Sequence, residues 1–165
     1  MFDLKPLSLE GVPAALERAD RYRLLNEPAE AESICADVLQ ADPENQRAII
    51  TLLLAASDRF SKGYGVSDVQ VKELLGRLTN DYDRAYYTGI MAERRAKAKL
   101  MQGTPGSGHW AYDLFREAMD WFEKAEGIAP PGNDDALLRW NTCARMIAKN
   151  KLEARIEEKI EPAFD

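Results

Sequence analysis

The stretch AMDWFEKAEGIAPP, residues 118–131, places small, aromatic and proline residues at regular positions along the chain. Ala118, Phe122 and Ala125 are separated by four and three residues, so they share one face of a helix. Pro130 follows five residues after Ala125, where it favours the end of that helix. The stretch therefore predicts a helix whose small residues allow a neighbouring helix to approach closely while Trp121 and Phe122 fill the space beside them.

The same gaps of four, three and five residues occur earlier in the chain, which indicates an internal repeat. The matching positions are Ala31, Cys35, Val38 and Pro43. A weaker central copy follows from Val71, Leu75 and Leu78, with Asp83 in place of the proline.

Helical periodicity covers nearly the whole chain, and no segment alternates apolar and polar residues as a strand does. Proline and acidic residues suited to first helical turns mark several starts, among them Asp42, Pro43 and Glu44 for a third helix and Ser67 with Gln70 for a fourth. The expected helices cover residues 13–25, 29–40, 43–60, 68–78, 84–102, 110–127 and about 133–160.

The repeated pattern resembles the tetratricopeptide repeat, a helix-turn-helix unit with a tyrosine, then alanine with an aromatic residue four positions on, and a closing proline. Tyr22 and Ala19 stand on the helix that precedes Ala31, as in that family. The family's early tryptophan and Leu-Gly pair are absent from the first unit, where Ala15, Arg18 and Ala19 occupy those places.

The resemblance implies an all-α fold: a right-handed helical-hairpin solenoid of about three helix pairs, followed by a long C-terminal capping helix. We expect one tetratricopeptide-like domain over residues 13–165 and an N-terminal arm over residues 1–12 that packs along the first helices or occupies the groove. The terminal helix carries an apolar stripe at Ala148, Leu152, Ile156 and Ile160. Capping is the preferred role for that stripe, and docking or homodimerisation is the alternative.

The loop GTPGSGH, residues 103–109, has the two glycines of a phosphate-binding loop at the right separation. His109 and Trp110 stand where such a loop needs a lysine and a hydroxyl, and a helix rather than a strand precedes it. The loop is therefore predicted to be a helix connection. His109, the only histidine, is expected to face solvent.

Composition excludes several classes of function. The net charge of −6 argues against general nucleic-acid binding, because phosphate contacts need clustered Lys and Arg. No apolar run approaches the length of a membrane span, and Cys35 and Cys143 have no spacing typical of a zinc site. We expect a cytoplasmic protein with two buried thiols and no cofactor.

Charge is unevenly distributed, because residues 84–99 contain five basic residues and the single acid Glu93. Tetratricopeptide arrays commonly bind a peptide or a partner helix along a concave surface lined by the first helix of each unit, and residues 84–102 form such a helix. The resemblance then implies a partner-binding row of Tyr87, Met91, Arg94 and Lys97, joined from the terminal helix by Leu137, Asn141 and Arg145. An acidic or carboxylate-bearing polypeptide suits this row. The alternative is a solvated outer face.

No nucleophile with a base, no pair of catalytic carboxylates and no metal-ligand spacing stands out. We therefore expect a non-enzymatic protein-protein interaction module. A small acidic chaperone of the secretion type is the second hypothesis, and an enzyme is the remote one.

Overall fold

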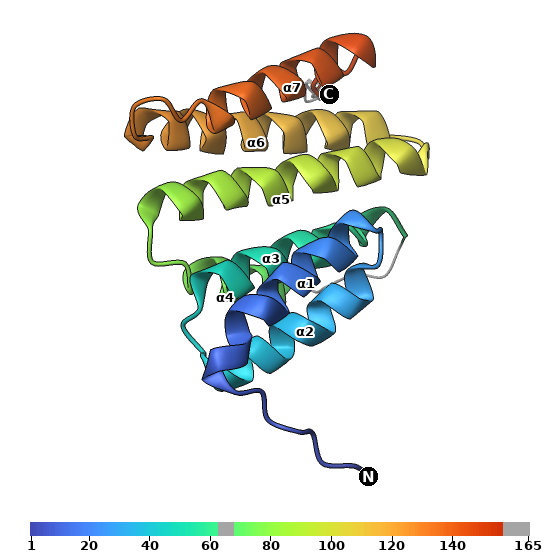
Figure 1. Cartoon of the computed structure of the whole chain (residues 1–165). Coiled ribbons are helices and arrows are strands. Elements are labelled where there is room, and N and C mark those ends of the chain that lie inside the picture. Colours follow the sequence, from blue (N-terminus) through green and yellow to red (C-terminus); the bar gives the residue numbers. More distant parts are fainter. Residues whose placement is uncertain (63–67, 157–165) are drawn as a thin grey trace, which may run out of the picture.

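The computed structural model describes residues 1–62 and 68–156, and within these ranges the chain forms helices and no strand (Figure 1). The prediction of an all-helical protein is confirmed. The helices are α1 (Val12–Leu24), α2 (Pro28–Ala41), α3 (Gln46–Ser57), α4 (Asp68–Gly76), α5 (Asp81–Gln102), α6 (Ser107–Ile128) and α7 (Asp135–Lys149), with short 3-10 turns η1 (Leu9–Gly11) and η2 (Phe60–Lys62).

Asparagine side chains fix two helix starts that the sequence placed elsewhere. Asn45 accepts a hydrogen bond from the Ala48 amide at 2.9 Å, so α3 begins after Asn45 and the expected start at Asp42 and Pro43 is wrong. Asn80 accepts one from the Asp83 amide at 3.0 Å and starts α5 earlier than expected. The proposed cap Ser67 lies outside the described residues.

Helices that follow one another along the chain pack against one another. Contacts join α1 to α2, α2 to α3, α5 to α6 and α6 to α7, and α3 also touches α1, α4 and α5. Figure 1 shows α5, α6 and α7 stacked on one side of the group formed by α1 to α4. A loop joins α5 to α6, as predicted, but it covers only residues 103–106, because Ser107 to His109 already belong to α6. Gly103 adopts the left-handed conformation that ends α5.

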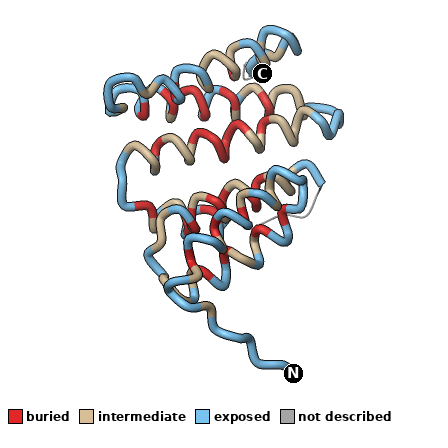
Figure 2. The backbone as a smooth tube through the Cα atoms, viewed as in Figure 1, coloured by how far each residue is buried: buried red, intermediate tan, exposed pale blue. Residues whose placement is uncertain are grey.

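The three helical positions in the first and third copies of the internal repeat are completely buried. They are Ala31, Cys35 and Val38 on α2, and Ala118, Phe122 and Ala125 on α6. In the central copy Val71 and Leu78 are buried and Leu75 is half-buried. Buried residues occupy the facing sides of α5 and α6, whereas the N-terminal arm is exposed along most of its length (Figure 2). The spacing therefore identified the packed face of both helices correctly.

Helices α5 and α6 approach each other closely at Gly89 on α5 and Phe122 on α6. A Cβ atom on Gly89 would lie 2.6 Å from Phe122 Cε1, which is shorter than real contacts allow. The absence of a side chain at Gly89 thus lets the buried ring of Phe122 lie directly against the α5 backbone.

The terminal helix is much shorter than expected. α7 ends at Lys149, and Lys151 adopts a left-handed conformation with φ of 50°. The Lys151 and Leu152 amides donate to the carbonyls of Ala148 and Ile147 at 3.2 and 3.0 Å, the hydrogen-bond pattern of a Schellman motif. This motif turns the chain back over the body of the protein.

The predicted helical stripe at the C-terminus is therefore wrong. Leu152 packs against the main core after the turn, Ile156 is 84% exposed outside any helix, and Ile160 lies outside the described residues. His109 is also not simply solvent-facing, because its Nδ1 lies 2.8 Å from the Glu153 carbonyl oxygen. A carbonyl only accepts, so Nδ1 carries the hydrogen.

Replacing Phe122 by alanine is expected to lower the free energy of unfolding by about 3–5 kcal/mol, because it truncates a fully buried aromatic side chain. Urea denaturation followed by circular dichroism measures this loss. Leu24→Ala, at an apolar side chain that is 84% exposed, is the control and should change stability by less than about 0.5 kcal/mol. A loss below about 1 kcal/mol for Phe122→Ala would contradict the packing described above.

Gly89→Ala and Gly127→Ala should have opposite effects on stability. At Gly89 the added methyl group overlaps the Phe122 ring, so we expect a loss of about 1–3 kcal/mol. At Gly127 nothing lies within 4 Å, so the higher helix propensity of alanine should stabilise by up to about 1 kcal/mol. Thermal melts compare the two variants, and a neutral Gly89→Ala would show that the helices have room between them.

Candidate functional site

Three cationic side chains from α5 and α7 line one pocket. Its volume is about 270 Å³, and it lies between the end of α3, η2, α5 and α7. We call it the basic groove. Its lining residues are Ser57, Asp58, Phe60, Ser61, Arg94, Lys97, Ala98, Met101 and Arg139.

Arg94 holds the C-terminal end of α3. Its guanidinium donates to the Leu54 carbonyl at 3.1 Å, to Ser57 Oγ at 2.7 Å and to Asp58 Oδ1 at 2.5 Å. A cation in this place compensates the negative end of the helix dipole and satisfies a carbonyl of the last turn. Burial lowers the pKa of Arg94, and the neighbouring Asp58 carboxylate opposes that effect.

Asp58 connects three helices through two arginines. Arg23, on α1, donates from Nε to Asp58 Oδ2 at 2.7 Å, while Arg94, on α5, contacts the other carboxylate oxygen. The side chains of these three residues are 21–24% exposed. Both oxygens of Asp58 are therefore engaged at the point where α1, α3 and α5 come together.

Glu93 is the second internal carboxylate, and it joins α5 to α7. Its side chain is completely buried and accepts a hydrogen bond from Arg139 on α7. Lys97 Nζ lies 3.7 Å from the other carboxylate oxygen, and the Cys143 thiol donates to that oxygen at an Sγ–O distance of 3.7 Å. A buried carboxylate is costly unless it is paired, so Arg139 and Lys97 make the position of Glu93 tenable.

The predicted partner-binding residues of α5 lie in three different surroundings. Arg94 and Lys97 line the basic groove together, whereas Met91 is only 1% exposed and belongs to the core. Tyr87 is half-buried and packs edge-on against Tyr86 at 5.1 Å between ring centroids. Tyr87 and Arg94 both lie within electrostatic range of Arg23, which places Tyr87 towards the α1 side of the same helix face.

The α7 residue that lines the basic groove differs from those expected. Arg145 is exposed and Asn141 half-buried, and neither lines the groove; Leu137 is also exposed. Arg139 takes the place expected for a cation from this helix. Neither Arg139 nor Glu93 was predicted from the sequence. The available signal was that Glu93 is the one acid in the basic stretch 84–99.

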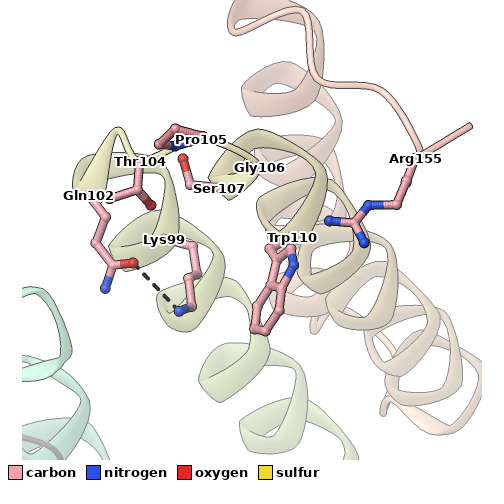
Figure 3. A pocket seen from close by; sticks show the side chains of 8 residues that line it. All are labelled: Lys99, Gln102, Thr104, Pro105, Gly106, Ser107, Trp110 and Arg155. Carbon is pink, nitrogen blue, oxygen red and sulfur yellow. Dashed lines mark hydrogen bonds between the residues drawn. The ribbon is translucent and has the colours of Figure 1, made fainter.

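A second, separate pocket of about 240 Å³ lies where α5 meets α6 (Figure 3). Lys99 donates to Gln102 Oε1 at 3.5 Å, and its Nζ lies 4.9 Å from the centre of the Trp110 ring. Arg155 reaches the pocket from the segment after α7. Lys97 and Lys99 are two residues apart, so they point to different sides of α5 and belong to different pockets.

Comparison with protein-family models, with curated proteins and with solved structures finds no match to this chain. Within residues 1–62 and 68–156, no three His, Cys, Asp or Glu side chains are grouped so that they could hold a metal ion. None of the helices that the structure describes is long and apolar enough to cross a membrane.

Both thiols should be unreactive in the folded protein. Burial is the main cause that raises the pKa of Cys143 and of Cys35 to about 12, and the neighbouring Glu93 adds to the effect at Cys143. At pH 8 neither thiol should react with Ellman's reagent until urea unfolds the chain, whereas a cysteine introduced at the exposed Leu24 should react at once.

The same shifts predict a loss of stability in alkali. A thiol that ionises near pH 9 when unfolded and near pH 12 when folded keeps its proton longer in the folded state. The free energy of unfolding should therefore be independent of these thiols below pH 9 and fall as the pH rises from 9 towards 12. Urea melts at pH 8 and pH 10.5 measure the difference, and Cys35→Ala should reduce it. Rapid native labelling of either cysteine would contradict this description of the core.

Proposed function

We propose that the chain is a non-enzymatic, tetratricopeptide-like scaffold that binds an acidic polypeptide segment in the basic groove. The observation that carries this proposal is the convergence of Arg94, Lys97 and Arg139 on one pocket that also exposes apolar side chains. Arg94 and Lys97 come from α5 and Arg139 from α7, so the groove spans two helices that are not consecutive in the chain.

A helical-hairpin solenoid accounts well for this arrangement. In that interpretation α1 with α2, α3 with α4, and α5 with α6 are the three pairs, and α7 is the first helix after them. The inner surface of such an array is lined by α1, α3, α5 and α7. Support comes from the contacts of α3 with both α1 and α5, and from the side chains of these four helices that meet at Asp58 and Glu93.

The charge balance of this surface favours an acidic partner. Four cationic side chains, Arg23, Arg94, Lys97 and Arg139, surround the two carboxylates Asp58 and Glu93. Two positive charges therefore remain uncompensated locally in a chain whose net charge is −6. An acidic segment would be attracted to this surface and repelled by most of the remainder of the molecule.

Lys97 is the cation best placed to meet a ligand. Its side chain is 37% exposed, compared with 22% for Arg94 and 32% for Arg139. An ammonium group carries three donors, and the contact with Glu93 engages only one side of it. Lys97 can therefore bind a carboxylate of the partner without releasing Glu93.

The dimensions and the apolar rim limit the length and composition of the partner. The groove follows α5 from Arg94 to Met101, about 10 Å at 1.5 Å per residue, which matches about three residues of an extended peptide. Met101 is 73% exposed and Phe60 is half-buried, and both line the groove. A short segment that combines acidic and apolar side chains suits this surface.

The proposal can be tested with a fluorescein-labelled peptide of alternating glutamate and leucine, and with the same peptide in which glutamine replaces glutamate. Fluorescence anisotropy should detect binding of the acidic peptide only, with an affinity that falls as salt is added. Lys97→Gln should weaken binding by about fivefold, the effect of losing one partly exposed ion pair.

Lys72→Gln, on an exposed position of α4 outside the groove, is the matched control and should leave the affinity unchanged. Circular dichroism confirms that both variants fold. Arg94 and Arg139 are left in place because each is hydrogen-bonded to an internal carboxylate, and Glu93 keeps its bond from Arg139 when Lys97 is replaced. Equal binding of the glutamine peptide, or equal effects of the two lysine substitutions, would overturn the assignment of the groove.

A further inference from the structure

A small groove on the outside of α1 and α2 is separate from the basic groove. Its volume is about 310 Å³, and its floor is formed largely by small and aliphatic residues. We call it the outer groove. Its lining residues are Leu7, Gly11, Ala14, Ala15, Arg18, Ile34 and Asp37.

The N-terminal arm leaves the molecule at the edge of this groove. Met1, Phe2 and Leu4 are 88% exposed or more, and Figure 1 shows the arm extending away from α1 and α2. Leu7 is the arm residue that remains against the body, where it packs beside the cluster formed by α1 and α2. Residues 1–6 therefore neither pack along the first helices nor occupy the groove, the two placements that the sequence left open.

Proline makes it difficult for the arm to turn back into its own groove. Pro6 restricts its own φ and keeps Lys5 in an extended conformation. Ser8 is also extended, with φ of −73° and ψ of 149°. The arm is therefore directed away from the groove that begins at Leu7, and the large apolar side chain of Phe2 is left exposed.

Charges on the arm and on the groove are complementary. The arm carries Asp3 and Lys5, and the rims of the groove carry Arg18 on α1 and Asp37 on α2. Over the ranges that the structure describes, none of these four side chains forms an ion pair or a side-chain hydrogen bond. If Asp3 paired with Arg18 and Lys5 with Asp37, each pair would join a short carboxylate to a long cationic side chain.

We propose that the arms of two copies of this chain exchange, so that Phe2 and Leu4 of each copy occupy the outer groove of the other. Asp3 then pairs with Arg18 of the second copy, and Lys5 with its Asp37. The arrangement is reciprocal, because each chain supplies one arm and one groove, and a two-fold symmetric dimer satisfies both at once. The basic groove takes no part in it.

Sedimentation velocity over a range of protein concentrations tests the dimer. The wild-type chain should show a monomer–dimer equilibrium, and the double variant Phe2→Ser, Leu4→Ser should be monomeric. The matched control is Leu24→Ser, Val69→Ser, which removes two apolar side chains that are 84% and 75% exposed elsewhere. This control should dimerise as the wild type does.

Charge reversal shows whether the arms cross between copies. Asp3→Lys and Arg18→Glu should each weaken the dimer at least about tenfold, because two ion pairs become repulsive in each dimer. Mixing the two variants in equal amounts should restore dimerisation to within about twofold of the wild type. In the mixed dimer, the lysine arm of one chain meets the glutamate rim of the other, and the remaining Asp3 meets the remaining Arg18.

All substituted residues are exposed, so the variants are expected to fold, and circular dichroism verifies this. A wild-type chain that stays monomeric, a dimer that persists when Phe2 and Leu4 are replaced, or a mixture that remains monomeric would each overturn the proposal. Binding of the acidic peptide to the basic groove is measured separately and does not depend on the result.

Discussion

The ion pair between Glu93 and Arg139 is the interaction on which the geometry of the basic groove depends. Glu93 is completely buried on α5, and a carboxylate there is tenable only with a cation and hydrogen-bond donors beside it. Arg139 supplies the cation from α7, so α7 must lie where its guanidinium reaches Glu93. Apolar packing holds α7 against α6. The contact between Arg139 and Glu93 then determines which residues of α7 face α5.

Asp58 has the corresponding role on the other side of α5. It receives Arg23 from α1 and Arg94 from α5, next to the end of α3. Because both arginines are held by internal oxygen atoms, they lose little conformational freedom when a ligand binds. The same pairing reduces their charge, so under the proposed function the groove would select an acidic segment more than bind it tightly. Lys97, which is more exposed and less engaged, would then contribute most of the difference in affinity between ligands.

The sequence predicted the packed faces of the helices well because burial follows local spacing. Ala118, Phe122 and Ala125 were identified from their gaps alone, and all three are completely buried. The basic stretch of α5 was identified in the same way. What the spacing could not supply was the alignment of α7 against α5, which depends on a contact between residues 93 and 139, 46 positions apart. The end of α7 was missed because the spacing of four residues from Ala148 to Leu152 is compatible with two structures. One is a continuing helix, and the other is a chain that turns at Lys151 and packs Leu152 onto the core, as observed.

The two ends of the helical stack differ in how their outer surfaces are covered. After α7, the returning segment places Leu152 against Gly108 and the Glu153 carbonyl against His109, so part of the chain covers the start of α6. At the other end, α1 and α2 pack on α3 with one face, and Leu7 and Gly11 are the residues before α1 that line the opposite groove. Stacked helical hairpins need a polar or covered outer face at each end. The outer groove has small residues and unpaired charges instead, and the apolar residues that would cover it are held away from it on the arm. In the dimer proposed above, the arm of the second copy would cover the outer groove without any change in the fold of either copy.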